Sequence, residues 1–489
     1  MTVDFGIGVN EVPTSLIPPV NVDGSLPMAF GCAPIHRIAD LDARDKAMPG
    51  NIVLCYSDAE AGQKLGIMAA RDDFGKWGLS EVAFSSFTLY GKAPVIFANV
   101  FDPTKHYKTK TDEVVTFSLD TATLSVGDIL NAITLKDAEN TAYTEGTDYT
   151  INKITGVITV IEDSALEAAI TAGKVFTASY RYAAPELVTV DDVIGGYDVL
   201  TTITTGLELV EQAFPQFRMV PGILLAPNFS QDPTVAMIMG AKCEGINAVF
   251  SCVAYVDLPT DTIKQYTDVP GYKAKVGLTD KNLYLCWPKV QVGSRQMNLA
   301  THAAGVTAVE DRQQNGIPFS SPSNKHLQCQ AAVLADGTEI SLSIPKVNFL
   351  RGNGIASVLN FTTGNTLWGT HSATFPGNTD PKDSYISSRR MLAWYGNRLV
   401  LTWWNKVDDP NNNRLIQIIA NSEQMSLNAL MAIGALAPGS SISARAEDND
   451  VLSLMAGKLT FHVMLGLVLP AELIRFDLEF DPYLLQNIF

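Results

Sequence analysis

The strongest constraint on the fold is an alternation of apolar and helix-like segments between residues 191 and 288. Segments 222–227 and 248–257 are apolar at almost every position, which is typical of strands covered on both faces. Residues 206–214 and 233–243, which precede them, have the pattern of helices. This order predicts parallel strands joined by right-handed crossovers. We expect an α/β core, to which the similar apolar segments 52–56 and 94–100 also belong.

The composition changes between about residue 105 and residue 184. This stretch is rich in threonine and alternates apolar with polar residues, and Gly146, Gly156 and Gly173 mark turns. Several short strands at such spacing predict a small β-sandwich. Because Pro103 and Pro185 border it, we expect an inserted domain at 105–184 that divides the α/β core into residues 21–104 and 185–380.

Both chain ends alternate apolar with other residues but lack the pattern of a complete core. At 1–20 a strand-like segment is followed by a proline-rich one, and at 471–489 apolar residues alternate with charged ones. A single strand cannot bury its own faces, so the N-terminal segment is either a frayed tail or an arm that completes a sheet elsewhere. The C-terminal segment is interpreted as a strand with one face that packs and one that meets solvent, which makes it a second candidate arm. Their apolar positions are Phe5, Ile7, Val9, Ile474, Phe476, Leu478 and Phe480.

Residues 381–470 have the pattern of an α+β domain. An apolar helical face runs through 384–437, a Pro438–Gly439 stop follows, and residues 459–469 alternate like a strand. The sequence thus predicts a multidomain α/β protein. It would have a parallel-sheet core, an inserted β-sandwich, an α+β C-terminal inner domain and extended terminal arms.

Charge and apolar content exclude several classes of protein. Thirty-five Lys and Arg against 51 Asp and Glu give a net charge of −16, which disfavours sequence-independent nucleic-acid binding. No apolar stretch reaches the roughly 18 residues of a membrane helix, and the first residues lack the pattern of a signal peptide. The six scattered cysteines are expected to be reduced thiols of a protein made in the cytosol. We therefore expect neither nucleic acid nor a membrane as a partner.

Few residues in the chain suggest catalysis. Nucleophile-elbow, phosphate-loop, zinc-protease and dinucleotide motifs are absent, and the six histidines have no short metal-ligand spacing. No catalytic, cofactor or metal site is therefore expected. Three features could belong to an active site, although a structural role is commoner for each. They are Asp257 after a buried strand, the polar group Asp311, Arg312 and 320–324, and the tryptophans Trp394, Trp403 and Trp404.

A basic region between residues 381 and 414 contrasts with the acidic whole. Its six cations outnumber its three carboxylates: Lys382, Arg389, Arg390, Arg398, Lys406 and Arg414 against Asp383, Asp408 and Asp409. Such a region suits an acidic partner surface, and it also suits a solvated helix face.

Gly305, Ala308 and Asp311 are followed by Gly316 and by the sequence Ser-Pro-x-Asn that ends at Asn324. This run resembles a segment of contractile tail sheath proteins. Further matches, in the family's order, are 8–13, 352–355, 364–369 ending in Trp-Gly, 389–392, 434–436 and 469–476. The β-rich stretch 105–184 fits the outward insertion that many members carry.

This resemblance implies a structural protein and not an enzyme. Family members stack as hexameric rings around a tail tube and contract to drive the tube through a bacterial envelope. The implied partners are further copies of the chain, a tail tube protein, and baseplate and tail terminator proteins. The implied location is the contractile tail of a virion assembled in the host cytoplasm.

The resemblance also suggests roles for the residues singled out above. The terminal arms would join a sheet of other subunits, and the basic region would face the tube through Arg389, Arg390 and Arg398. Three alternatives stay open: an R-type bacteriocin, type VI-like or other injection system; a hydrolase or transferase using Asp257 and the 305–324 loop; and a static capsid or baseplate protein.

Overall fold

Parallel strands form the centre of the protein in the computed structural model, which describes residues 20, 22–200, 202–362 and 364–483. Within these residues a nine-stranded sheet has the order β2-β3-β1-β13-β16-β17-β23-β24-β20. The six strands from β3 to β23 run parallel, and antiparallel strands close both edges. In sheet order the strands are Ile52–Cys55, Val95–Asn99, Pro27–Gly31, Ile223–Leu225, Val253–Asp257, Leu283–Cys286, Ile355–Asn360, Asn365–Trp368 and Lys325–His326.

The predicted parallel unit is confirmed, with two local differences. β13 and β16 pair in parallel, and α7 (Pro233–Lys242) lies between them in sequence. The expected helix at 206–214 is a 3-10 segment, Gly206–Gln212, that continues into α6 (Ala213–Phe217). The strand expected from residue 248 begins only at Val253. Asn247 and Ala248 have positive φ and turn the chain in a hairpin of β14 (Glu244–Ile246) and β15 (Phe250–Ser251).

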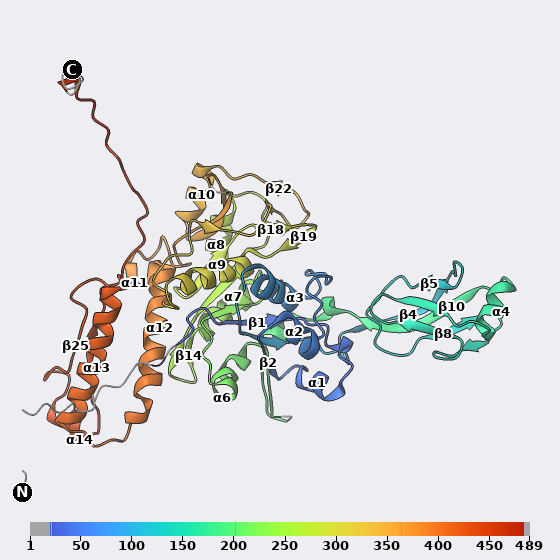
Figure 1. Ribbon diagram of the computed structural model, residues 1–489, viewed down its shortest axis with the longest axis horizontal. Coiled ribbons are helices and arrows are strands. Elements are labelled where there is room, and N and C mark those ends of the chain that lie inside the picture. The colour runs from blue at the N-terminus through green and yellow to red at the C-terminus, as the bar shows by residue number, and fades with distance from the viewer. Residues whose placement is uncertain (1–19, 21, 201, 363, 484–489) are drawn as a thin grey trace, which may run out of the picture.

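Helices cover the sheet on both faces and enclose one large apolar core (Figure 1). α9 (Leu299–Gln313) packs against β16 and β17, and α3 (Gly78–Ala83) packs against β1. The largest enclosed side chains include Trp77, Trp287, Tyr255, Tyr284 and Phe97. Because each buried side chain of this size contributes roughly 1.5–3 kcal/mol, these aromatics are a main source of the core's stability. Further helices around it are α1 (Leu41–Lys46), α2 (Asp58–Leu65), α5 (Val190–Ile194), α8 (Val269–Val276) and α10 (Ile344–Arg351).

Residues 107–183 form two small sheets with an apolar core of their own. Tyr149, Ile158 and Leu166 lie in that core, and Figure 1 shows the unit projecting away from the main sheet. Its first and last strands, β4 (Tyr107–Val115) and β10 (Phe176–Ala183), pair antiparallel. The other elements are β5 (Thr121–Thr123), β6 (Thr134–Asp137), β7 (Ala142–Tyr143), β8 (Tyr149–Asn152), β9 (Val157–Val160) and α4 (Ala165–Thr171). The sequence pattern did not indicate helix α4. Its N-terminus is capped by the Ser164 side chain, which accepts the backbone N–H of Glu167.

The C-terminal part consists of two long helices and a small hairpin. α12 (Ile386–Trp403) follows the short α11 (Pro381–Ser384), and α13 (Asn413–Ala432) packs beside it through Trp394, Leu427 and Leu430. The hairpin pairs β25 (Ser441–Ser443) with β26 (His462–Met464), and α14 (Val451–Met455) lies between them in sequence. The strand expected at 459–469 is therefore formed only in part.

Candidate functional site

The chain beyond residue 472 leaves the body of the protein as an extended segment (Figure 1). Residues 468–481 have no helix or strand. Ile474, Phe476, Leu478 and Phe480 are between 71% and 97% exposed. The strand expected there is not formed, because a strand requires a hydrogen-bonded partner and none of the described segments pairs with it. These four side chains have the exposure that an arm requires. Phe5, Ile7 and Val9 lie outside the described residues.

A single carboxylate holds the beginning of this segment against the core. Glu472 Oε1 accepts hydrogen bonds from Thr370 Oγ1 at 2.7 Å and from Arg351 Nη2 at 2.9 Å, and it lies 3.1 Å from His371 Nε2. Arg351 ends α10, and Thr370 and His371 follow β24, so the carboxylate joins two parts of the core. Although partial burial opposes the shift, the hydrogen bonds from Thr370 and Arg351 lower the pKa of Glu472. We call Glu472, Arg351, Thr370 and His371 the arm anchor.

The second strand-forming feature is the hairpin of β25 and β26. It has only two strands within the described residues, joined by the pairs Ser441–Met464, Ile442–Val463 and Ser443–His462. On the outer edge of β25, the Gln424 side chain of α13 accepts the N–H of Ile442 at 3.2 Å and donates to the backbone oxygen of Ser440 at 3.3 Å. The outer edge of β26 has the backbone hydrogen-bonding groups of an edge strand, and a two-stranded sheet is marginal alone. The hairpin can therefore accept further strands.

Two of the three arginines expected to face a tube are buried in ion pairs. Arg390 is 2% exposed, and its Nη1 lies 3.1 Å from Asp311 Oδ1, while its Nη2 also bonds Asp311. Arg398 is 3% exposed, and its Nη2 donates to Glu423 Oε2 at 2.7 Å. Both guanidinium groups are enclosed and paired within their own chain, which argues against a direct tube contact through these two; the tube contact itself stays a prediction. Arg390 ties α12 to α9, and Arg398 ties α12 to α13.

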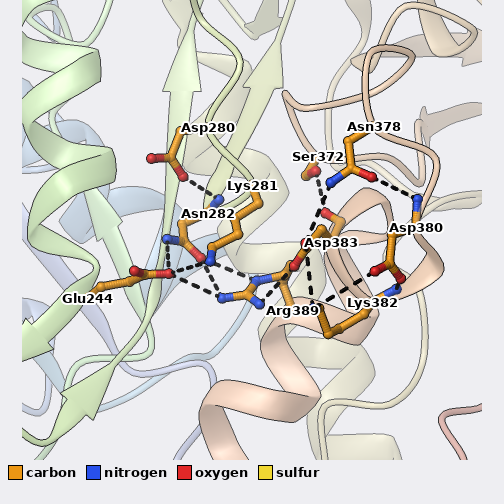
Figure 2. A network of polar contacts seen from close by, with 10 residues as sticks. All are labelled: Glu244, Asp280, Lys281, Asn282, Ser372, Asn378, Asp380, Lys382, Asp383 and Arg389. Atoms are coloured by element: carbon orange, nitrogen blue, oxygen red, sulfur yellow. Dashed lines mark hydrogen bonds and ion pairs between the residues drawn. The ribbon is translucent and has the colours of Figure 1, made fainter.

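The third arginine, Arg389, belongs to a polar network at the start of α12 (Figure 2). Its Nη2 donates to Asn282 Oδ1 at 2.9 Å, its Nη1 lies 3.2 Å from Asp383 Oδ1, and Glu244 lies 3.5 Å away. The side chain is 13% exposed. It joins α12 to the residue before β17, and a contact with a tube stays a prediction for it.

Glu423 organises the interface between α12 and α13, and the sequence reading missed it. Besides Arg398, it accepts from Trp403 Nε1 at 2.9 Å and from Tyr395 OH at 3.2 Å. The Glu423 residue is 1% exposed. Because three donors meet one enclosed carboxylate, its charge is compensated as buried charges require. Of the tryptophans considered as pocket residues, Trp394 packs in the helical core and Trp404 is 65% exposed.

The candidate catalytic residue Asp257 performs a structural task. It is 4% exposed, and its Oδ1 accepts the backbone N–H of Ala300 in the first turn of α9 at 2.9 Å. Burial raises its pKa to about 6. Asp311 and Arg312 lie on α9 and not on a loop, and Arg312 bonds the backbone oxygen of Gly91.

The glycines of the sequence motifs allow close packing. A Cβ on Gly305 would lie 2.1 Å from Cδ2 of Tyr90, and one on Gly369 would lie 2.6 Å from Cα of Ala356. Together with Asp311, Gly305 therefore fits α9 between the core and α12.

The described residues contain no arrangement of three or more His, Cys, Asp or Glu side chains that could hold a metal ion. Among the helices of the same residues, none combines the length and the apolar character of a membrane span.

Comparisons with known proteins show which proteins this chain is similar to. No family model matches the chain. The tail sheath protein of Burkholderia phage BcepMu is 29% identical over 408 residues, which cover 80% of this chain and 82% of that protein. The chain is a homologue of contractile tail sheath proteins.

Solved sheath structures share the fold of this homologue. The sheath of the extracellular contractile injection system PVC in its contracted state superposes with a TM-score of 0.58 at 13% identity, over 99% of each chain. The contracted helical sheath of the anti-feeding prophage gives 0.53 at 12% identity, over 98% of this chain and 100% of that one. A sheath tail protein from Desulfitobacterium hafniense gives 0.52 at 11% identity, over 91% and 94%.

Proposed function

We propose that this protein polymerises around a tail tube as a contractile sheath whose subunits exchange strands through their terminal arms. The observation that carries the proposal is the exposed C-terminal arm. Its four apolar side chains at positions 474–480 alternate with charged ones and contact no core of their own chain. Such a segment suits strand addition to another molecule, and the homology to the phage protein supports a sheath.

The hairpin of β25 and β26 is the acceptor that we propose for the arms of other subunits. Gln424 of α13 bonds the outer edge of β25, so the outer edge of β26 is the one that we propose as the acceptor. The arm offers an unpaired strand with one apolar and one charged face. Val463, Leu465 and Leu467 pack against the core of the α12–α13 pair, so an added strand would extend an existing apolar layer. Pairing in trans would also protect an exposed strand from aggregation.

The free-energy contributions to one joint between an arm and a hairpin nearly cancel. Burying four large side chains contributes roughly 6–12 kcal/mol, whereas ordering the seven residues 474–480 costs roughly 7–14 kcal/mol. These terms nearly cancel, so the backbone hydrogen bonds, at about 1 kcal/mol each, decide the sign. One joint is therefore weak, and many joints in a polymer hold together.

The anchored arms would remain connected while the globular bodies move. In the proposed mechanism, subunits stack as hexameric rings and contract by rigid-body repacking, with the arm beyond Glu472 as the connector. The proposed partners are further copies, a tail tube protein, and baseplate and terminator proteins, in a virion tail assembled in the host cytoplasm. The phage relative supports a phage tail, while the shared fold keeps an injection-system sheath as the alternative.

Truncation after Glu472 tests the joint. The shortened protein is expected to stay folded, by circular dichroism and thermal unfolding. It is expected to form none of the striated tubes that we expect for the full chain in electron micrographs. A pair of matched variants separates the two faces of the arm. Leu478→Asp, on the apolar face, is expected to block assembly, and Glu479→Gln, on the charged face, is expected to permit it. Normal tubes from the truncated chain would refute the strand exchange.

The hydrolase alternative has little support from the site. The Asp257 carboxylate is enclosed and bonded to a helix backbone, and the first part of the 305–324 segment, residues 305–313, belongs to α9. We propose a structural role without catalysis. Turnover of hydrolase substrates that disappears in Asp257→Asn would contradict it.

A further inference from the structure

A hairpin with exposed apolar side chains projects from the body of the protein near α6 (Figure 1). Its strands β11 (Gly196–Asp198) and β12 (Ile203–Thr205) pair antiparallel, in a sheet of two strands within the described residues. Tyr197, Val199 and Leu200 are 61%, 78% and 94% exposed. We call these three residues the apolar knob. Large apolar side chains that gather at one exposed place are typical of a contact with another molecule.

The base of this hairpin is packed closely on the core. Gly195 and Gly206 stand at its two ends, and a Cβ on either would collide with backbone atoms. Ile203 lies against Gly50, where an added Cβ would be 2.6 Å from Ile203 Cγ2. β12 also packs against α5 and the 3-10 segment 206–212. Because its base is already ordered, the hairpin loses less conformational entropy on binding than a free loop would lose.

A pocket of matching chemistry lies between α12, α6 and the hairpin of β14 and β15. Its cavity of about 490 Å³ is lined mainly by aromatic and aliphatic groups, among them Phe214, Val249, Phe250, Leu401 and Trp404. The rings of Phe214 and Phe250 lie 4.8 Å apart, and Trp404 is 65% exposed. We call these five residues the aromatic pocket. Concave apolar surfaces are the usual place for binding, and tryptophan is enriched among the residues that contribute most to it.

Charge and exposure indicate that the apolar knob of a second copy fits this pocket. Asp198 is the only charged residue in segment 196–205, and its Oδ1 accepts the N–H of Leu200 at 2.9 Å, so a carboxylate lies beside the knob. Among the described residues that line the pocket, only Arg218 is charged, and its guanidinium lies over the Phe214 ring. An anion on the knob and a cation at the pocket are complementary. Since Leu200 is almost fully exposed, the knob does not fill the pocket of its own chain.

We propose that the apolar knob of one subunit inserts into the aromatic pocket of a second copy, with Asp198 directed towards Arg218. Because the knob and the pocket are different surfaces of one chain, each copy can enter one neighbour and receive another. Such heterologous contacts propagate into rings or helical filaments. The inference rests on the proposed sheath function, to which it adds a contact between globular bodies that involves neither terminal arm.

Disulfide trapping between two full-length variants tests this contact. Leu200→Cys carries a thiol on the knob, and Val249→Cys carries one at an exposed position of the pocket. With copper phenanthroline as oxidant, the mixture of the two variants is expected to form covalent dimers at least several-fold faster than either variant alone. The matched control mixes Val249→Cys with Leu119→Cys, because Leu119 is 89% exposed in the inserted unit. The native cysteines are buried or partly buried, and the parent protein measures their background.

The concentration needed for assembly gives a second readout. Leu200→Asp is expected to stay folded by circular dichroism and to raise the protein concentration required for tube formation by roughly ten-fold or more. Leu119→Asp, the same change at a similarly exposed leucine, is expected to assemble like the parent.

Equal cross-linking in the two mixtures would overturn the proposal, and so would equal assembly of the two aspartate variants. Dimers that form fastest from Leu200→Cys alone would also overturn it, since the knob would then meet a second knob. A parent protein that forms no tubes would instead refute the proposed function. The cross-linking result would still decide the contact, because it needs two copies but no tube.

Discussion

Replacement of Gly305 by alanine measures how closely α9 packs on the core. In the structure a Cβ at this position would lie 2.1–2.7 Å from three ring atoms of Tyr90. Tyr90 is held in place from both sides: its hydroxyl lies 2.9 Å from His302 Nδ1 and accepts the N–H of Gln328 at 3.1 Å. The ring can therefore move only by breaking hydrogen bonds or by pushing α9 outwards.

The expected change in the free energy of unfolding combines two destabilising contributions and one stabilising contribution. Overpacking a filled core costs about 1–3 kcal/mol, and each lost hydrogen bond of Tyr90 costs about 1 kcal/mol. The better helix propensity of alanine returns about 1 kcal/mol. With one or two hydrogen bonds lost, Gly305→Ala is expected to lower the free energy of unfolding by about 1–4 kcal/mol.

Gly396 provides the matched control, because it lies inside helix α12 and a Cβ there would meet nothing within 4 Å. Gly396→Ala is expected to be neutral or to stabilise by up to about 1 kcal/mol. Both variants and the parent would be unfolded in urea as monomers and followed by tryptophan fluorescence. If Gly305→Ala proves as stable as Gly396→Ala, the close packing of Tyr90 on α9 is refuted.

Three further predictions concern the buried ion pair, the enclosed carboxylate and the inserted unit. Arg390→Ala leaves Asp311 buried without its cation and is expected to destabilise by about 3–5 kcal/mol. Arg389→Ala, at a partly exposed network, should cost less than half as much; equal losses in urea unfolding would contradict this. Burial raises the pKa of Asp257 from 3.8 to about 6, so its contribution to stability is present below pH 4 and lost as pH rises to about 6. Asp257→Asn, which keeps an acceptor for Ala300, should therefore gain on the order of 2–3 kcal/mol relative to the parent between pH 4 and 7; a difference that does not change with pH would refute the assignment. Finally, Tyr107 and Ala183 are paired neighbours, so a short Gly-Ser linker can replace residues 107–183. The midpoint of thermal unfolding of the remaining core should stay within a few degrees of the parent's. A core that fails to fold would show that the inserted unit is not independent.

The contacts that attach the inserted unit to the core include one that the sequence pattern does not reveal. Asp128 accepts from Arg37 Nε at 2.7 Å and from Nη2 at 3.0 Å, which ties the base of the insertion to the core. The two residues are 91 positions apart. The strands of the insertion were readable, because alternation is a local property. Their attachment was not, since a pairing over such a separation leaves no periodic signal.

The sequence alone determined the parallel unit of the core and the alternating strands of the insertion, because both depend on the spacing of apolar and turn residues within a few positions. It did not indicate helix α4 or the hairpin of β14 and β15. Tertiary structure decided what the charged residues do. Arg390 and Arg398 form a basic stretch in the sequence, yet each meets a buried carboxylate from another helix, Asp311 or Glu423. Likewise, Glu472 became an anchor only because α10 and the end of β24 bring Arg351 and Thr370 to the same oxygen. A charge in a sequence has no partner until the chain has folded, and its partner determines whether it holds the protein together or faces another molecule.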